Sequence, residues 1–258
     1  MRIPELEELI PIIERAAGAV LALSKNSKIL RSGEFPLTEA DIASHEVLVD
    51  GLAQFEIPIL SEENTRDADA ASRYLWVVDP LDGTSDYADR RPEWAVMVAL
   101  LEKETPILGI VCAPALGVTY TAQKGAGAFA IRGGARTKIH VRPPSDPLTL
   151  LVSVRHHTKL MTDVALKLGA EEVKMGSAGV KICRIAEGKA DLMLTGGKLG
   201  EWDVAAPQCI LEEAGGIVSD LNGAPLQYRN PEWRIPNGLL AGSQAAHERA
   251  RDALSRIA

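Results

Sequence analysis

Two carboxylates stand three residues apart in segment 79–84, which reads Asp-Pro-Leu-Asp-Gly-Thr and follows the apolar run 75–78. Asp79, Asp82 and the carbonyl oxygen of Leu81 could bind Mg²⁺, because hard divalent ions favour oxygen ligands. Gly83 would let the backbone approach a phosphate closely. The alternative is an ordinary proline and glycine turn whose acids are solvated. The segment alone leaves both interpretations open.

Further acids could join this pair. Glu62 and Glu63 follow the apolar run 57–60, and Asp203 precedes an expected helix. A solvated loop and a helix cap are the alternative interpretations of these acids. Asp41 lies in the first turn of another expected helix, where a helix-dipole acid would also occur. Carboxylates gathered at the ends of neighbouring strands would repel one another unless cations lay among them, so the set predicts a divalent-metal site.

Cationic residues near these acids could hold an anionic substrate. Arg155, His156 and His157 follow the expected strand 148–154, and Lys181 lies in an expected helix. Arginine and lysine bind phosphate through charge-assisted hydrogen bonds, so a phosphate ester is the natural expectation. A surface polar pair is the more common role for adjacent histidines, and a structural role for the lysine stays open.

Hydrophobic periodicity divides the chain into two halves of different character. In residues 1–144 two expected helices precede a series of strands, which is an α+β arrangement. In residues 145–258 strands and helices alternate, which implies an α/β arrangement with helices covering a sheet. The proline-rich stretch 142–147 separates the halves. The expected helices are 5–24, 39–55, 159–168, 178–187, 204–214 and 244–257, and the expected strands are 57–60, 75–78, 94–101, 107–113, 119–123, 127–131, 148–154, 190–194, 216–219, 239–241 and one near Val173.

The composition excludes several classes of protein. With 258 residues, 46% of them apolar, the chain can form one large or two closely packed units. A net charge of −7 provides no global positive field for nucleic acid or anionic lipid. Three cysteines without Cys-x-x-Cys spacing suggest neither a disulfide framework nor a thiolate metal cluster. With no signal peptide and no apolar run longer than 94–101, we expect a cytoplasmic protein without stable membrane insertion; loose association with the inner membrane stays open.

The acidic motifs occur in the order 60–63, Leu-Ser-Glu-Glu; 76–84, Trp-Val-Val-Asp-Pro-Leu-Asp-Gly-Thr; and 202–206, Trp-Asp-Val-Ala-Ala. In this order they resemble the lithium-sensitive, magnesium-dependent phosphatase superfamily that includes inositol monophosphatase and fructose-1,6-bisphosphatase. The resemblance covers nearly the whole chain, and its Asp-Pro-Leu-Asp-Gly-Thr motif is highly specific. It implies a layered α-β-α-β-α sandwich that hydrolyses a phosphate monoester.

Three other stretches, 38–45, 106–114 and 181–188, resemble the bacterial 3′(2′),5′-bisphosphate nucleotidases of the CysQ type. This resemblance implies hydrolysis of adenosine 3′,5′-bisphosphate to AMP and phosphate, with the 5′-phosphosulfate relative as a second candidate substrate. The physiological role would be to clear a by-product of sulfate assimilation. Inositol monophosphatase or fructose-1,6-bisphosphatase activity on the same scaffold is the alternative. The sequence leaves the oligomeric state undetermined.

The resemblance also implies a catalytic centre with two to three Mg²⁺ ions. Its ligands would be Glu62, Asp79 and the Leu81 carbonyl for one ion, Asp79, Asp82 and Asp203 for a second, and Glu62 for a weaker third. The ions would activate the attacking water and stabilise charge on the leaving oxygen. Thr84 and Asp41 match the pair that orients this water, and Glu62 would assist them.

The implied substrate contacts combine the metal-binding segment with cations from the second half of the chain. Arg155 and His157 correspond to the Ser-Arg-Ser-His stretch of the bacterial nucleotidases, and Lys181 to the lysine of their Gly-Ser-Ser-x-Lys segment. The full set of substrate-binding candidates is Leu81, Asp82, Gly83, Thr84, Arg155, His157, Ser177, Lys181 and Asp203.

The chain departs from the nucleotidase pattern at three places. Segment 31–35, Arg-Ser-Gly-Glu-Phe, replaces a lysine-containing loop. Segment 176–179 reads Gly-Ser-Ala-Gly, which moves or removes a phosphate-binding hydroxyl. Segment 193–195 reads Met-Leu-Thr where many relatives have Tyr-x-Arg. The motifs therefore specify phosphatase chemistry more closely than they specify nucleotide preference.

Two rival interpretations of the acidic motif belong to other functional classes. Asp-x-Asp-Gly-Thr marks a phosphatase class whose first aspartate forms an aspartyl-phosphate. Here the spacing is Asp-x-x-Asp and no long cap-like insertion follows, which favours direct attack by water. The second rival is a binding module for divalent ions or nucleotides that has lost turnover. The presence of the whole acidic set together with Thr84 favours an enzyme.

Overall fold

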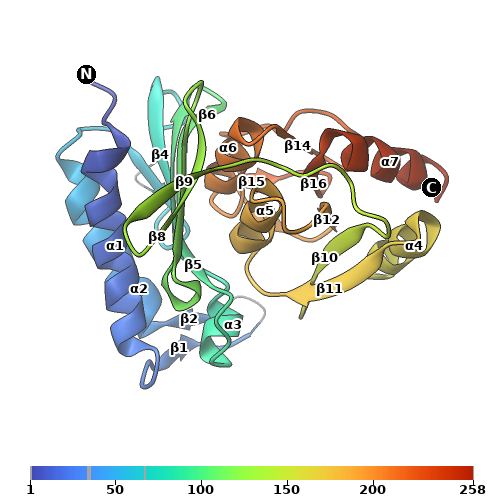
Figure 1. Ribbon diagram of the computed structural model, residues 1–258. Coiled ribbons are helices and arrows are strands. Elements are labelled where there is room, and N and C mark those ends of the chain that lie inside the picture. The colour runs from blue at the N-terminus through green and yellow to red at the C-terminus, as the bar shows by residue number, and fades with distance from the viewer. Residues whose placement is uncertain (1, 34–35, 67, 258) are drawn as a thin grey trace.

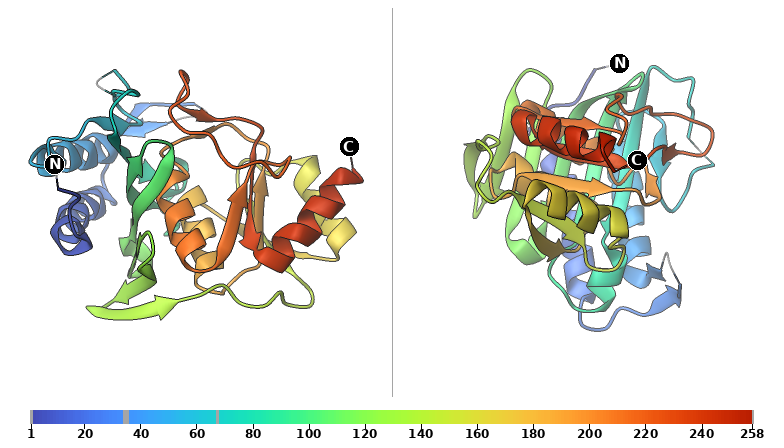
Figure 2. Two further views of the ribbon diagram at one scale, coloured as in Figure 1. Left: turned by 90° about the horizontal axis from the view of Figure 1, so that it is seen from above. Right: turned by 90° about the vertical axis from the view of Figure 1, so that its right-hand side faces the viewer.

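The computed structural model describes residues 2–33, 36–66 and 68–257, so Glu34 and Phe35 of the divergent segment 31–35 lie outside the described residues. Helices and sheets alternate as five layers in Figures 1 and 2. In order, the layers are α1 (Leu6–Leu23) with α2 (Glu39–Ala53), a seven-stranded sheet, α5 (Ala178–Ala186) with α6 (Ala205–Glu213), a five-stranded sheet, and α4 (Lys159–Leu168) with α7 (Gln244–Ser255). The α-β-α-β-α sandwich implied by the sequence is confirmed.

The two sheets occupy different parts of the chain. The larger sheet has the order β3-β4-β5-β6-β7-β8-β9 and is antiparallel except between β3 and β4. The smaller has the order β11-β10-β12-β16-β14, with β10 parallel to both its neighbours. The strands of the larger sheet are β3 (Ile59–Ser61), β4 (Tyr74–Asp82), β5 (Ala95–Glu102), β6 (Thr105–Ala113), β7 (Val118–Gln123), β8 (Gly127–Arg132) and β9 (Ala135–Ile139), and those of the smaller are β10 (Thr149–Ser153), β11 (Glu171–Met175), β12 (Leu192–Thr195), β14 (Gly216–Ser219) and β16 (Leu239–Ser243).

Alternation along the central strands builds two separate hydrophobic cores. On β4, Trp76 and Val78 pack toward α1 and α2, whereas Leu75 and Val77 pack toward α5 and α6. Successive side chains of a strand point to opposite faces, so an unbroken apolar run is the sequence form of a strand covered on both sides. A third core lies between the smaller sheet and α4 with α7. Run 75–78 is therefore covered on both faces, which explains why it is apolar throughout.

The first two helices follow their sequence signals closely. Apolar residues of α1 from Leu6 to Val20 are buried at three- and four-residue steps, whereas Leu21 is exposed, and Pro11 lies inside the helix on its exposed side. The helix therefore continues through Pro11. Thr38 caps α2, and the Asp41 carboxylate accepts a hydrogen bond from the Thr38 backbone N–H at 2.7 Å. This capping box fixes Asp41 at a buried position.

The structure also contains elements that the hydrophobic pattern did not predict. The strand predicted at 75–78 extends as β4 to Asp82, with an irregularity between Asp79 and Asp82, so these acids lie on an irregular strand end rather than on a turn. The remaining additions are short or exposed: β1 (Ile29–Arg31), β2 (Leu37–Thr38), α3 (Thr84–Ala88), η1 (Pro114–Leu116), β9, β13 (Leu199–Gly200) and β15 (Arg234–Ile235). Such segments bury too little apolar surface to show a period.

The connection between the sheets, residues 140–148, is tied to the second half by a buried carboxylate. Asp191 accepts hydrogen bonds from the Arg142 guanidinium at 2.9 and 3.1 Å and from the backbone N–H groups of Ser145 and Thr149 at 3.1 and 2.7 Å. The Ser145 hydroxyl donates to it as well. The predicted division at 144/145 falls in this connection.

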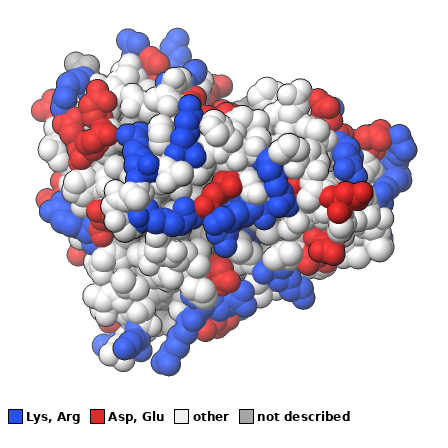
Figure 3. All heavy atoms as spheres, in the orientation of Figure 1, with Lys and Arg blue, Asp and Glu red and all other residues white. Residues whose placement is uncertain are grey.

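The outer features of the molecule add two facts. The face shown in Figure 3 carries basic side chains across its middle with acidic side chains among them, so it has charges of both signs. No helix within the described ranges is long and apolar enough to cross a membrane.

Candidate active site

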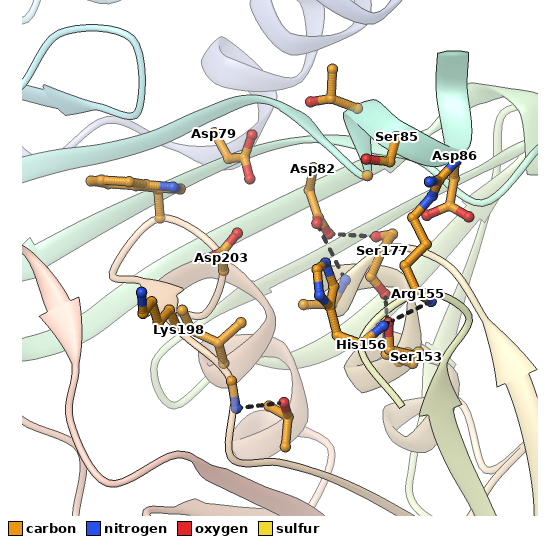
Figure 4. A pocket seen from close by; sticks show the side chains of 18 of the residues that line it. Asp79, Asp82, Ser85, Asp86, Ser153, Arg155, His156, Ser177, Lys198 and Asp203 are labelled. Atoms are coloured by element: carbon orange, nitrogen blue, oxygen red, sulfur yellow. Dashed lines mark hydrogen bonds between the residues drawn. The ribbon is translucent and has the colours of Figure 1, made fainter. Parts of the chain in front are cut away.

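A cavity of about 220 Å³ lies between the two halves of the chain. The larger sheet contributes Asp79 and Asp82 at the end of β4, followed by the first turn of α3. The second half contributes Ser177 before α5 and Asp203 before α6. Figure 4 shows these four side chains directed toward a common space. The site therefore depends on packing between segments that are far apart in the sequence.

Three aspartates form the centre of this cavity. Asp79, Asp82 and Asp203 each offer a carboxylate oxygen, and these oxygens lie within 4.8 Å of one another. The Oδ1 atom of Asp79 accepts the Leu81 backbone N–H at 2.9 Å, whereas its Oδ2 atom is buried without a hydrogen-bond partner. A buried carboxylate oxygen without a partner is strongly unfavourable in a protein interior. The donor set and this unpaired oxygen fit a divalent cation.

The electrostatics of the aspartates point the same way. Burial, followed by the charges of Glu62 and Asp82, raises the pKa of Asp79 well above its usual value. Burial and the Asp82 carboxylate raise the pKa of Asp203 to about 7. Both causes act against the charged form, so the cluster needs either protons or added positive charge near neutral pH. A bound cation would supply that charge and hold the carboxylates ionised.

Asp82 also joins the two halves of the chain. Its Oδ2 atom accepts hydrogen bonds from the Ser177 hydroxyl and from the Gly179 N–H at 2.7 Å, and its Oδ1 atom accepts the Ala178 N–H at 3.2 Å. These donors form the N-terminal turn of α5, where a negative charge is favoured. Ser177 caps the same helix and has a φ of 52°, a strained backbone angle for a serine.

Two glycines allow this close approach. Gly83 has a φ of 88°, and a Cβ atom there would lie 2.9 Å from the Glu93 carbonyl oxygen. At Gly179 a Cβ atom would lie 2.2 Å from the Met97 sulfur and 3.1 Å from an Asp82 oxygen. A larger residue at Gly179 would push α5 away from Met97 and Asp82. The unusual Gly-Ser-Ala-Gly segment thus brings backbone donors, as well as a hydroxyl, to the acid.

Thr84 and Asp41 come together as the resemblance implied. The Thr84 hydroxyl lies 3.0 Å from Asp41 Oδ1 and 2.9 Å from the Leu81 carbonyl oxygen, so its one proton can be donated to either acceptor. The capping bonds from Thr38 hold the other oxygen of Asp41. Burial raises the pKa of Asp41 despite these donors. Thr84 lines the cavity, and its hydroxyl lone pairs are available to a water there.

Glu62 lines the same cavity but does not belong to the tight cluster of three aspartates. Burial and the charge of Asp203 raise its pKa well above the usual value. The neighbouring Glu63 has its pKa raised to about 7, chiefly by burial and then by Asp41. Both glutamates therefore add to the excess of negative charge around the cavity.

The cations predicted from the sequence are arranged less uniformly. Arg155 lines the cavity and its guanidinium pairs with Asp89. His156 lines it as well, whereas His157 is not among the lining residues and its Nε2 lies 3.1 Å from Glu172 Oε2. Residues 154–156 form a bend after β10, so the residues on either side of it need not alternate as in a strand.

Lys181 has a different environment from the exposed cations. It lines the cavity, but its buried ammonium donates to the carbonyls of Ser177, Met175 and Gly176 at 2.9, 3.3 and 3.4 Å. Burial lowers its pKa. Lys181 thus supports the turn that presents Ser177 to Asp82.

Several lining residues had no individual signal in the sequence. Met161 from α4 and Met193 from β12 form part of an apolar wall, and the Arg234 guanidinium lies 5.5 Å from the centre of the Trp202 ring. Lys198 lines the cavity from the short turn before β13. Methionines are common in cores and lysines are common on surfaces, so neither type marks a site in the sequence. Only the packing of the second half against the first identifies these residues as part of the cavity lining.

Comparison with known proteins agrees with this geometry. A profile described as "Inositol monophosphatase family" matches residues 5–257. The protein named 3′(2′),5′-bisphosphate nucleotidase CysQ of Escherichia coli K12 is 32% identical over 244 residues, which are 89% of this chain and 98% of that protein. The crystal structure of CysQ from Bacteroides thetaiotaomicron superposes with a TM-score of 0.80 at 27% identity, covering 92% of this chain and 96% of that one. The inositol monophosphatase of Thermotoga maritima shares the fold, with a TM-score of 0.82 at 22% identity over 98% and 97% of the two chains.

Proposed function

This chain belongs to the inositol monophosphatase family and is a phosphatase, and we propose that its reaction is the hydrolysis of the 3′-phosphate of adenosine 3′,5′-bisphosphate to AMP and phosphate. Relatives with the name of that nucleotidase are 32–34% identical over about nine tenths of this chain. The adenosine 5′-phosphosulfate that carries a 3′-phosphate is a second candidate substrate. The expected role is to clear a by-product of sulfate assimilation in the cytoplasm, where the three buried cysteines would stay reduced.

The observation that carries the reaction class is the aspartate cluster, in which Asp79 and Asp82 are buried, Asp203 is half-buried and one Asp79 oxygen is unpaired. Phosphatases of this family are metal-dependent. We propose Mg²⁺ as the ion, with two to three ions held by Asp79, Asp82, Asp203, Glu62 and the Leu81 carbonyl. When bound, these ions would supply the positive charge that acidifies a water and stabilises the transferred phosphoryl group. Competition by lithium at this site would follow from the resemblance.

The protein's own contribution begins with the attacking water. We infer that the Thr84 hydroxyl donates its hydrogen bond to Asp41 and not to the Leu81 carbonyl, which leaves its lone pairs to accept a hydrogen bond from the water. The capping box of α2 holds Asp41 in place, so the direction of this bond is fixed before substrate arrives. Glu62 would accept a second hydrogen bond from the same water. The water then attacks phosphorus directly, without an aspartyl-phosphate.

The substrate would enter with its reacting phosphate at the aspartates. Gly83 and Thr84 line the cavity at this point, where phosphate oxygens would lie beside the backbone. Ser177 and Asp203 border the same space from the second half. Arg155 would bind substrate by exchanging its pair with Asp89 for a phosphate, because both partners are exposed and an exposed ion pair is weak.

A comparison of three substrates tests this proposal. We expect kcat/KM with millimolar Mg²⁺ to be highest for adenosine 3′,5′-bisphosphate, lower for inositol 1-phosphate and lowest for fructose 1,6-bisphosphate. Preference for either of the last two would overturn the nucleotide assignment and leave the phosphatase chemistry intact. Turnover in ¹⁸O-labelled water should place the label in phosphate; label in the protein would support a covalent aspartyl intermediate instead.

A further inference from the structure

The turn between β12 and β13, residues 196–198, borders the cavity from the second half of the chain. Buried Thr195, at the end of β12, accepts a hydrogen bond from the Gly197 N–H through its hydroxyl at 3.0 Å. This bond fixes the turn immediately before Lys198, which lines the cavity. The backbone position of Lys198 is therefore set by the buried strand end, although its side chain is exposed.

Lys198 differs from the other lysine and from the arginine considered as substrate contacts. Lys181 donates to three backbone carbonyls, and Arg155 pairs with Asp89. Lys198 forms no ion pair with any residue that the structure describes. Figure 4 shows Lys198 on the Asp203 side of the cavity, whereas Arg155 and Ser177 lie on the Asp82 side. Its ammonium can therefore meet an anion that enters beside the aspartates.

The distribution of charge suggests which anion this is. The reacting phosphate must lie at the aspartates, where cations would neutralise it. A second phosphate on the same substrate could not share that position, because Asp79, Asp82 and Asp203 crowd their negative charge there. It needs a separate positive charge on the cavity wall, outside the cluster. Gly196 leaves open space near Lys198 for such a group, because a Cβ atom there would meet no atom within 4 Å.

We propose that Lys198 binds the second phosphate of a nucleoside bisphosphate and thereby makes the enzyme select bisphosphates over monophosphates. The assignment rests on the proposed function and names a residue that sets its specificity. A single exposed ammonium is a point charge without the fixed fork of an arginine, so its contribution is moderate. Residues 193–195, Met-Leu-Thr, provide no cation to this part of the cavity wall. Lys198, three residues after Thr195, would thus supply one.

Kinetics of Lys198→Ala on a matched pair of substrates tests the assignment. Adenosine 3′,5′-bisphosphate carries the second phosphate, and adenosine 3′-monophosphate lacks it. We expect kcat/KM for the bisphosphate to fall about tenfold, mostly through a higher KM, which corresponds to about 1.4 kcal/mol. The value for the monophosphate should change less than twofold. Lys198→Arg should recover most of the bisphosphate activity, and Lys198→Glu should lose more than Lys198→Ala.

Lys103→Ala provides the control, because Lys103 is an exposed lysine at the opposite end of β5 from the aspartates. This variant should leave the ratio of the kcat/KM values for the two substrates unchanged. If Lys198→Ala lowers kcat/KM equally for both substrates, or for neither, Lys198 does not bind the second phosphate. The proposed function would still stand in that case. If the wild-type enzyme prefers inositol 1-phosphate, the proposed function fails first, and this assignment fails with it.

Discussion

Two groups of buried aspartate in this molecule have opposite environments. Asp191 is fully buried at the connection between the sheets, yet Arg142, Ser145 and Thr149 surround it with donors and lower its pKa to about 2. Asp79 is also fully buried, but its neighbours are other acids and one of its oxygens has no partner. Both are ionisable residues in the interior, and only Asp191 has neighbours in the protein that balance its charge.

The difference separates structure from function. A buried carboxylate with a full set of donors contributes to stability, and its oxygens have no free lone pair with which to bind a ligand. A buried carboxylate among like charges lowers stability, so it is retained where a ligand completes it. Burial of an aspartate is thus uninformative by itself. The identity of its neighbours indicates whether it supports the fold or binds a cation.

The largest effect should come from Asp79→Asn. The amide keeps the shape and can still accept the Leu81 N–H, but it removes a charged metal ligand, so kcat should fall on the order of 10³-fold or more. The thermal midpoint of the metal-free variant should equal or exceed that of the wild type, because one repelling charge is gone. Steady-state kinetics and calorimetry would measure the two effects. Near-normal turnover would contradict the cation site.

Asp191→Asn should have the opposite profile. It removes the charged acceptor for Arg142 and for backbone donors of the connection, which should cost roughly 2 to 4 kcal/mol of unfolding free energy. Turnover per folded molecule should stay within about twofold, since Asp191 is not among the residues lining the cavity. Chemical denaturation would measure the loss. A stable but inactive variant would show that the two groups are not separate.

Metal-free stability should fall as pH rises from about 4 to 7. Folded-state pKa values of about 7 for Glu63 and Asp203 lie above the unfolded values, so the folded protein binds more protons in this window and its advantage is lost at higher pH. Added Mg²⁺ should therefore raise Tm more at pH 8 than at pH 5.5. Scanning calorimetry with and without chelator tests this. An equal Mg²⁺ effect at both pH values would contradict it.

The pKa of Asp191 is shifted in the opposite direction, so Asp191 should contribute almost no change in stability between pH 4 and pH 7. Its folded pKa lies below the unfolded value, so its stabilisation is complete above about 4 and is lost only as pH falls through about 2. Asp191→Asn should consequently lower Tm by a similar amount at pH 5.5 and pH 8. A strongly pH-dependent difference between these values would show that another group is coupled to Asp191.

Much of this arrangement could be predicted from the sequence, for physical reasons that differ between elements. The helix starts at Thr38 and Thr158 have capping hydroxyls, and long apolar runs such as 94–101 identify buried strands. The acids of segment 79–84 could be identified because two carboxylates stand three residues apart directly after an apolar run. These signals are local, because each depends on residues within about one turn or one strand.

What the sequence did not contain was the assignment of each polar residue to a partner. Nothing local distinguishes Asp191, which accepts from Arg142, from Asp79, which lacks a partner. The exchange of His156 for His157 at the cavity and the short strands β13 and β15 depend on how the two halves pack. The Lys181 ammonium binds carbonyls only four to six residues earlier in the chain, whereas long-range packing places Lys198 at the cavity.

Calorimetric titration of the metal-free chain with Mg²⁺ at pH 8 tests most directly whether the three aspartates form a cation site. The wild type and Asp191→Asn should bind the same number of ions, two or more per chain, and Asp79→Asn should lose at least one of them. If Asp79→Asn binds as many ions as the wild type with the same affinity, or if the wild type binds none, the acids do not form that site.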